Sequence, residues 1–175
     1  MSEQTPEVLL FIDGPFGIDF QCPMIIDGRQ YDTVRHYCIE KKVRLLMPSV
    51  PPIPNGLSPL ELRAYSVDAW INSTSAQQEA WMAIARDVMM RASLAKFADN
   101  LKLRAQLLLT DDKILAYADD SDLRWGTGVG IDHPDAEHPD RWPGDNWAGN
   151  VLTALREHLT VMNCGASQGA CSKVL

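Results

Sequence analysis

A stretch rich in tryptophan and glycine stands in the C-terminal third of the chain. Trp125, Gly126 and Gly128 open it, and Trp142 and Asn146 close it before an amphipathic helical pattern. Glycine lets a backbone approach a ligand closely, tryptophan offers a flat apolar face, and binding groups concentrate in loops on a rigid scaffold. These residue types in this order therefore indicate a ligand-binding loop.

A second group of reactive residues lies on a predicted helix near residues 33–46. Arg35 and Lys42 fall on the same side of such a helix, about 10 Å apart along its axis. If the side chains converge, the arginine charge would leave more of Lys42 as free amine, the form that attacks carbonyl carbon. The alternative is a solvated basic face with Lys41 and Arg44, which the spacing by itself favours.

Two residues of the tryptophan-rich stretch have a structural alternative. The Trp125 ring could stack on a base or nicotinamide-like ring, or could belong to the core. Asn146 could contact a ligand, or could only cap the last helix. Trp81 stands among apolar residues of a helical pattern, which places it in the core.

The sequence predicts neither a metal site nor a cofactor. His133 and His138 are five residues apart, and Pro134 and Pro139 exclude a helix that could present both. A phosphate-binding loop of the P-loop type is missing from the sequence. Four cysteines without metal-ligand spacing are interpreted as reduced and mostly structural.

The elements that must position these residues follow from periodicity and turn chemistry. Strands are expected over residues 7–12 and 113–118, with a hairpin over 24–31 around Asp27-Gly28. Candidate helix caps are Asp32 or Thr33, then Ser58, and then Thr74 or Ser75. The expected helices begin after these caps, at residue 101 and at residue 151, the last ending near 161. The fold class is therefore α+β, mainly helical with a small β-sheet.

Length and charge limit the domain count and the partners. A chain of 175 residues fits one domain, predicted over residues 1–162, with a flexible C-terminal tail over 163–175. The net charge of −7 argues against a broad basic groove for nucleic acid. No membrane span or signal peptide is expected, so we predict a cytoplasmic protein without membrane contact.

The spacing of the C-terminal residues resembles the closing motif of the NADAR (YbiA-like) family. That motif reads W-G-x-G, D-x-P, W-x-G-x-N-x-x-G and a final L-R helix. The sequence matches it at Trp125, Gly126, Gly128, Asp132, Pro134, Trp142, Gly144, Asn146, Gly149, Leu155 and Arg156. Further similarity covers roughly residues 15–159, at Phe20, Tyr31, His36, Lys42, Trp81, Ala95-Lys96-Phe97 and Asp122.

The resemblance implies an α+β enzyme that hydrolyses N-glycosidic bonds. Family substrates are ADP-ribose linked to guanine and phosphoribosylamine intermediates of riboflavin synthesis. The expected partner is therefore a small nucleotide or sugar phosphate, with ADP-ribosylated nucleic acid as a further partner.

The resemblance also assigns site residues. Lys42 takes the family's ribose-opening position, and Asp132 and Asp122 are the carboxylates expected to stabilise the sugar cation or orient water. Other acidic loop residues are interpreted as solvated. The predicted binding residues are Phe20, Arg35, His36, Trp125, Gly126, Gly128 and Asn146.

The sequence departs from the family pattern at three positions. Arg35 and Tyr117 replace glutamates, and Ser66-Val67 stands where the family has a glycine-arginine pair. An arginine in a pocket binds phosphate as a bidentate donor. The alternative function is therefore a catalytically impaired binding module for ADP-ribose-like nucleotides.

Overall fold

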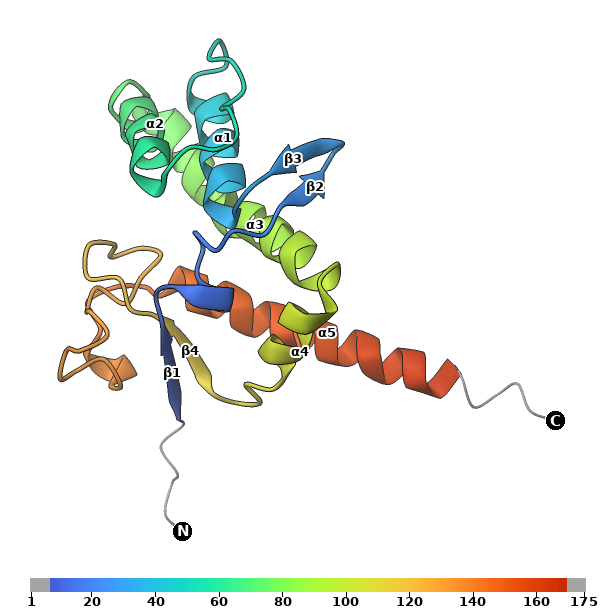
Figure 1. Cartoon of the computed structure of the whole chain (residues 1–175). Helices are drawn as coiled ribbons and strands as arrows, with labels where there is room; N and C mark the ends of the chain where they lie inside the picture. The colour runs from blue at the N-terminus through green and yellow to red at the C-terminus, as the bar shows by residue number, and fades with distance from the viewer. Residues whose placement is uncertain (1–6, 170–175) are drawn as a thin grey trace. The chain divides into compact units, whose positions relative to one another are not determined.

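The computed structural model describes residues 7–169, with side chains described up to residue 163. The chain forms two compact units. The helical unit is Asp13–Asp99, and the terminal unit is Met1–Ile12 together with Asn100–Leu175. The described residues contain five α-helices and two two-stranded sheets, which confirms the predicted α+β class (Figure 1).

Three helices form the body of the helical unit, and each begins at the cap expected from the sequence. The Thr33 side chain accepts a hydrogen bond from the third residue beyond it, while Ser58 and Thr74 each form a full capping box. A cap satisfies backbone N–H groups that have no partner inside the helix. The helices are α1 (Val34–Leu46), α2 (Pro59–Ile71) and α3 (Ser75–Ala98).

A β-hairpin precedes these helices. Strands β2 (Met24–Ile26) and β3 (Arg29–Tyr31) pair antiparallel, with Ile26 opposite Arg29. Asp27 and Gly28 both have positive φ angles, 54° and 77°, as the predicted tight turn requires. A 3₁₀ turn, η1 (Gly14–Phe16), lies at the start of the unit.

The core of the helical unit is centred on α1, which packs against both α2 and α3, while β2 packs on α3. Trp81 is buried there, as predicted. The core also contains the carboxylate of Glu40, which accepts hydrogen bonds from Arg29, from the Tyr31 hydroxyl and from the Ile53 amide. This buried acid, which belongs to α1, joins that helix to the hairpin and to the proline-rich loop, because both of them donate to it.

The terminal unit is built on two parallel strands. Strand β1 (Val8–Phe11) pairs with β4 (Ile114–Tyr117), with Phe11 opposite Tyr117. Helix α4 (Leu101–Leu108) precedes β4, a 3₁₀ turn η2 (Pro139–Arg141) follows it, and α5 (Trp147–Gly169) packs against β4 (Figure 1).

Helix α5 is longer than the sequence predicted. We expected a helix from residue 151 to about 161, whereas the helix begins at Trp147 and ends at Gly169. Asn146 and Gly149 have low helix propensity, so the local pattern favours a later start. Gly149 is instead required there, because a Cβ atom on it would lie 1.9 Å from the Leu115 carbonyl oxygen. The segment 170–175 of the predicted tail lies outside the described residues.

Candidate functional site

Lys42 is held by α2 and does not extend freely into solvent. Its Nζ atom donates to the Ser66 hydroxyl at 2.8 Å and to the Ser66 carbonyl oxygen at 3.1 Å. The same atom lies 4.9 Å from the centre of the Trp70 ring, within cation–π distance. Lys42 is therefore fixed in one direction, in contrast to a solvated basic face.

Arg35 turns to a different partner. Its guanidinium forms a two-pronged contact with the Asp19 carboxylate, at 2.6 and 2.9 Å. The Arg35 side chain is 10% exposed and that of Asp19 is 28% exposed, so this pair is part-buried. Arg35 contacts Asp19 and Lys42 contacts Ser66, so the condition set above, that the two cationic side chains converge, is not the arrangement in the structure.

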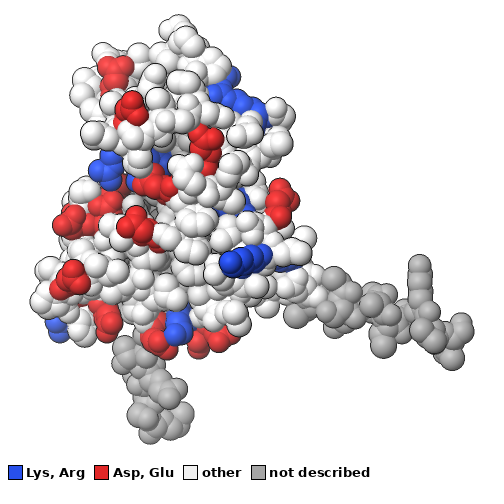
Figure 2. Space-filling model, in the orientation of Figure 1, with Lys and Arg blue, Asp and Glu red and all other residues white. Residues whose placement is uncertain are grey.

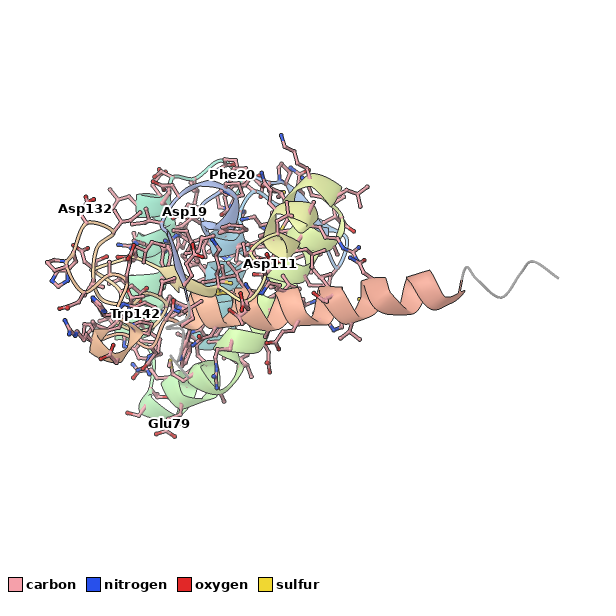
Figure 3. The ribbon with its side chains drawn as sticks, turned by 90° about the horizontal axis from the view of Figure 1, so that it is seen from below. Asp19, Phe20, Glu79, Asp111, Asp132 and Trp142 are labelled. Carbon is pink, nitrogen blue, oxygen red and sulfur yellow. The ribbon has the colours of Figure 1, made fainter. Side chains whose placement is uncertain are left out.

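Phe20 lies beside Asp19 on the loop that precedes β2 (Figure 3). The loop is tied to the start of α1, because the Arg35 amide donates to the Ile18 carbonyl and the Cys22 amide donates to the Asp32 carbonyl. Arg35, at the start of α1, therefore contacts the loop that carries Phe20. A binding role shared by the two residues requires this proximity.

His36 is buried in the helical unit. Its Nε2 atom contacts the Ile53 carbonyl oxygen at 3.1 Å, and its ring meets the Tyr31 ring edge-on. Only 2% of the residue is exposed. His36 therefore supports the loop over α1 in the structure, while its predicted role in binding remains a prediction.

Cys38, also on α1, is a poor candidate for a thiol nucleophile. Desolvation raises the pKa of the Cys38 thiol to about 12, only partly offset by the nearby Arg35 charge. A thiol with this pKa stays protonated at neutral pH, and the thiolate is the reactive form.

In the terminal unit, Asp122 orients the tryptophan of the W-G-x-G segment. Its Oδ1 atom accepts hydrogen bonds from the amides of Arg124 and Trp125, at 2.9 and 2.8 Å. The Trp125 ring then meets the Trp147 ring edge-on, with centroids 5.4 Å apart. Trp125 is half-buried, so part of its ring packs and part is accessible.

The glycines of this segment allow backbone to pack on backbone. A Cβ atom on Gly126 would lie 2.7 Å from the carbonyl oxygens of Asp119 and Asp122. Gly128 has a φ angle of 75°, which few other residues adopt, and a Cβ atom there would meet Leu123 and Pro143. The sequence suggested that these glycines let a ligand approach the backbone closely. In the structure, other parts of the chain itself lie in that space.

Asn146 links the strand to the last helix. Its side chain accepts from the Tyr117 amide at 3.0 Å and donates to the Leu115 carbonyl at 2.8 Å, like an added strand residue. Its φ angle is 48°, in the left-handed region that asparagine tolerates. Of the two interpretations left open by the sequence, the contacts favour a structural role at the helix start.

Asp132 lies apart from this cluster. It is exposed, on the outer part of the 130–142 loop that Figure 3 shows. The same loop is stabilised by the Arg141–Asp135 pair at 2.9 Å, and that contact lowers the pKa of Asp135. Within residues 7–163 no group of three or more His, Cys, Asp or Glu side chains could hold a metal ion.

The positions that depart from the family pattern have identifiable partners. Tyr117 is buried against Phe11, with ring centroids 5.6 Å apart, so its position belongs to the core of the terminal unit. Ser66 supplies two of the oxygen atoms that bind Lys42. Arg35 has Asp19 as its partner.

A buried lysine was not assigned a role by the sequence. Lys96 on α3 is 2% exposed, and burial lowers its pKa to about 8. A signal was present, because the buried positions Trp81, Ala85, Met89 and Ala92 recur at helical spacing and Lys96 continues that series. The series predicts a core position, where an unpaired lysine is rare.

A cavity of about 810 Å³ lies elsewhere in the terminal unit. It is lined by residues of the segment between α4 and β4, among them Asp111 and Asp112, and by residues of α5, among them Arg156. None of the ten predicted site residues lines it. Figure 3 labels Asp111, which lies close to α5 in that view.

The fold and the site together define an α+β protein with a tryptophan-glycine segment locked against a short parallel sheet. The NADAR domain family model matches residues 7–160. The chain therefore belongs to the NADAR family. Membership supports a family-level, glycosidase-like function, and the family is associated with N-glycosidase activity.

A solved structure shows the same fold. The protein is similar to the Escherichia coli protein YbiA, solved by NMR, with a TM-score of 0.61 and 23% sequence identity. The similarity covers 92% of this chain and 89% of the YbiA chain. No match was found among curated proteins.

Membership of the NADAR family suggests a small-molecule substrate. Acidic and basic side chains are interspersed on the face that Figure 2 shows. A search of the described helices finds none long and apolar enough to cross a membrane.

Proposed function

We propose that this protein is an N-glycosidase that hydrolyses the N-glycosidic bond of an ADP-ribosyl or (phospho)ribosylamine compound. Examples of this class are ADP-ribosylated guanine and an early intermediate of riboflavin synthesis. The observation that carries the proposal is the fixed position of Lys42, whose Nζ atom is directed by Ser66 and Trp70. A directed amine supports nucleophilic catalysis better than a mobile surface lysine does.

The chemistry requires the neutral amine of Lys42. Its attack on C1 of the ribose breaks the C1–N bond, and the departing nitrogen takes up a proton. The sugar ring then opens to give an imine on the lysine. Water adds to C1, releases the free sugar and restores the amine. In this scheme Asp132 and Asp122 stabilise positive charge at C1 or orient the water.

The binding part of the proposal rests on Phe20, Trp125 and Arg35. Phe20 and Trp125 offer aromatic faces for a base. Arg35 is an anchor for phosphate only if the phosphate displaces Asp19, because the carboxylate already has both prongs of the guanidinium. This contact weakens the argument for a dedicated phosphate-binding module, which was based on an available arginine.

The experiment is a product assay with borohydride trapping. The protein is incubated with ADP-ribosylated guanosine or with the riboflavin intermediate, and released base is quantified by chromatography. Borohydride in a parallel reaction should fix ribose on Lys42, detected by peptide mass spectrometry. Tight binding of both compounds without any released base would instead support the alternative, a binding module for ADP-ribose-like nucleotides.

A further inference from the structure

Lys96 is a lysine in a place where the fold itself needs only an apolar side chain. It stands on the buried face of α3, and its Nζ atom donates to the Gly17 carbonyl oxygen at 2.9 Å. The rings of Phe20 and Phe97 lie 5.1 and 5.2 Å from the same atom. One carbonyl and two ring faces are thus its contacts within the helical unit.

This environment is expensive for an ammonium group. An ammonium has three N–H donors, and a buried charge is stabilised only when it is well paired. Burial accordingly lowers the pKa of Lys96 to about 8, with nearby Cys22 and Asp19 acting in the opposite direction. Replacing such a charge by an apolar side chain is often neutral or stabilising. Stability therefore does not explain a lysine at this position.

The contacts of Lys96 converge on one turn. The Gly17 carbonyl oxygen accepts from Lys96 and also from the Phe20 amide, which closes the turn Gly17–Phe20. The turn carries Asp19, the partner of Arg35, and its Ile18 carbonyl accepts from the Arg35 amide. The Phe20 ring packs against the Lys96 charge. Lys96 thus contacts both the backbone and the aromatic ring of this turn.

We propose that Lys96 is a positioning residue for substrate binding, whose charged ammonium holds the Gly17–Phe20 turn so that Phe20 and the Asp19–Arg35 pair meet the substrate in a fixed geometry. The inference rests on the proposed function, which places Phe20 and Arg35 in the binding site. The groups that face Lys96 are Asp19 and Cys22 from the loop before β2 and Phe97 from α3 itself, and Arg35 faces Asp19.

The test compares wild type with Lys96→Met and Lys96→Arg, and uses Lys102→Met on the exposed face of α4 as the control. Affinity for ADP-ribose is measured by calorimetry between pH 6.5 and 9.5, and unfolding by denaturant is measured for every variant. Amide NMR signals of Gly17 and Phe20 are followed over the same pH range without ligand.

The expected results separate positioning from folding. Lys96→Met should be as stable as wild type or more stable at pH 7, yet bind ADP-ribose at least tenfold more weakly. Wild-type affinity should fall above about pH 8 as the ammonium loses its proton, and the signals of Gly17 and Phe20 should change with the same midpoint. Lys96→Arg, which stays charged, should retain binding at pH 9, and Lys102→Met should match wild type.

Two results would overturn the inference. The first is a folded Lys96→Met that binds ADP-ribose as wild type does. The second is the absence of any change near pH 8 in the amide NMR signals of Gly17 and Phe20 in the wild-type protein. This measurement does not need either Lys96 variant, so it decides the question even if both variants fail to fold. Wild type that neither binds nor hydrolyses ADP-ribosyl compounds would overturn the proposed function and this inference together, and is recognised by the wild-type measurement alone.

Discussion

The ammonium of Lys42 lies 2.8 Å from the hydroxyl oxygen of Ser66, a contact that joins α1 to α2 across 24 residues of sequence. Ser66 is at the position where the family resemblance predicts glycine, a residue that has no hydroxyl to accept this hydrogen bond. The contact gives Lys42 a defined direction in this chain. It also requires the amine to leave an oxygen partner before it can attack a sugar.

Lys42→Ala should abolish turnover and leave the fold intact. The lost hydrogen bonds of a part-buried lysine should reduce the free energy of unfolding by about 1 kcal/mol. The measurement is release of base from ADP-ribosylated guanosine, with circular dichroism as the fold check. Lys41→Ala is the matched control, since the Lys41 Nζ atom lies over the Tyr37 ring on the same helix, and this variant should keep full activity. Normal turnover by Lys42→Ala would remove this lysine from the mechanism.

Asp132→Asn should lower kcat more than it changes KM. The substitution keeps the size of the side chain and removes the charge, so a carboxylate that acts in the transition state loses rate with near-normal binding. Steady-state kinetics at a fixed pH measure the two constants. Asp140→Asn, also exposed and acidic, is the control. Equal losses in binding and rate would indicate that Asp132 positions the substrate.

Arg35→Glu should weaken activity and destabilise the helical unit. The new carboxylate would face Asp19 in a part-buried place, where the loss should exceed the value of about 0–1 kcal/mol for a surface ion pair. Unfolding by denaturant measures the loss. The double variant Asp19→Arg/Arg35→Glu restores opposite charges and should regain a large part of the stability. Raised glycosidase activity in the single variant would mean that the natural chain is a decayed enzyme and would favour the binding-module function.

The stability of the protein should depend on pH through Lys96. The folded pKa of about 8 lies below the ordinary lysine value of 10.5, so the unfolded chain holds the proton more strongly. The folding penalty is therefore fully present below pH 8 and is relieved as pH rises from 8 to 10.5, by about 3 kcal/mol. Subtracting the unfolding free energies of Lys96→Met from those of wild type isolates this term. A difference that stays flat over this range would contradict the lowered pKa.

Gly149→Ala should destabilise the terminal unit by about 1–3 kcal/mol or more, because the new methyl group would collide with the Leu115 carbonyl oxygen. Gly130→Ala is the control, since its Cβ atom would meet only the Asp120 carboxylate at 3.9 Å. Thermal or denaturant unfolding measures both. A Gly149→Ala protein as stable as wild type would show that α5 can shift away from β4 at little cost.

The sequence predicted those features that depend on neighbouring residues. Thr33, Ser58 and Thr74 cap helices as expected, and Asp27-Gly28 forms the hairpin turn, because capping and turn formation involve side chains and amides only a few residues apart. Spacing was also enough to identify the NADAR motif and the buried position of Trp81. The α+β class followed from these local signals.

Only the tertiary structure decided what the candidate site residues contact. Arg35 pairs with Asp19, Lys42 with Ser66, and Lys96 with Gly17, which is 79 residues away in sequence. Periodicity placed Lys96 on a helix face, but the choice of a carbonyl and two aromatic rings as its partners depends on how α3 packs against the loop before β2. Such partners are brought together by folding over long sequence distances, so no local pattern in the chain encodes them.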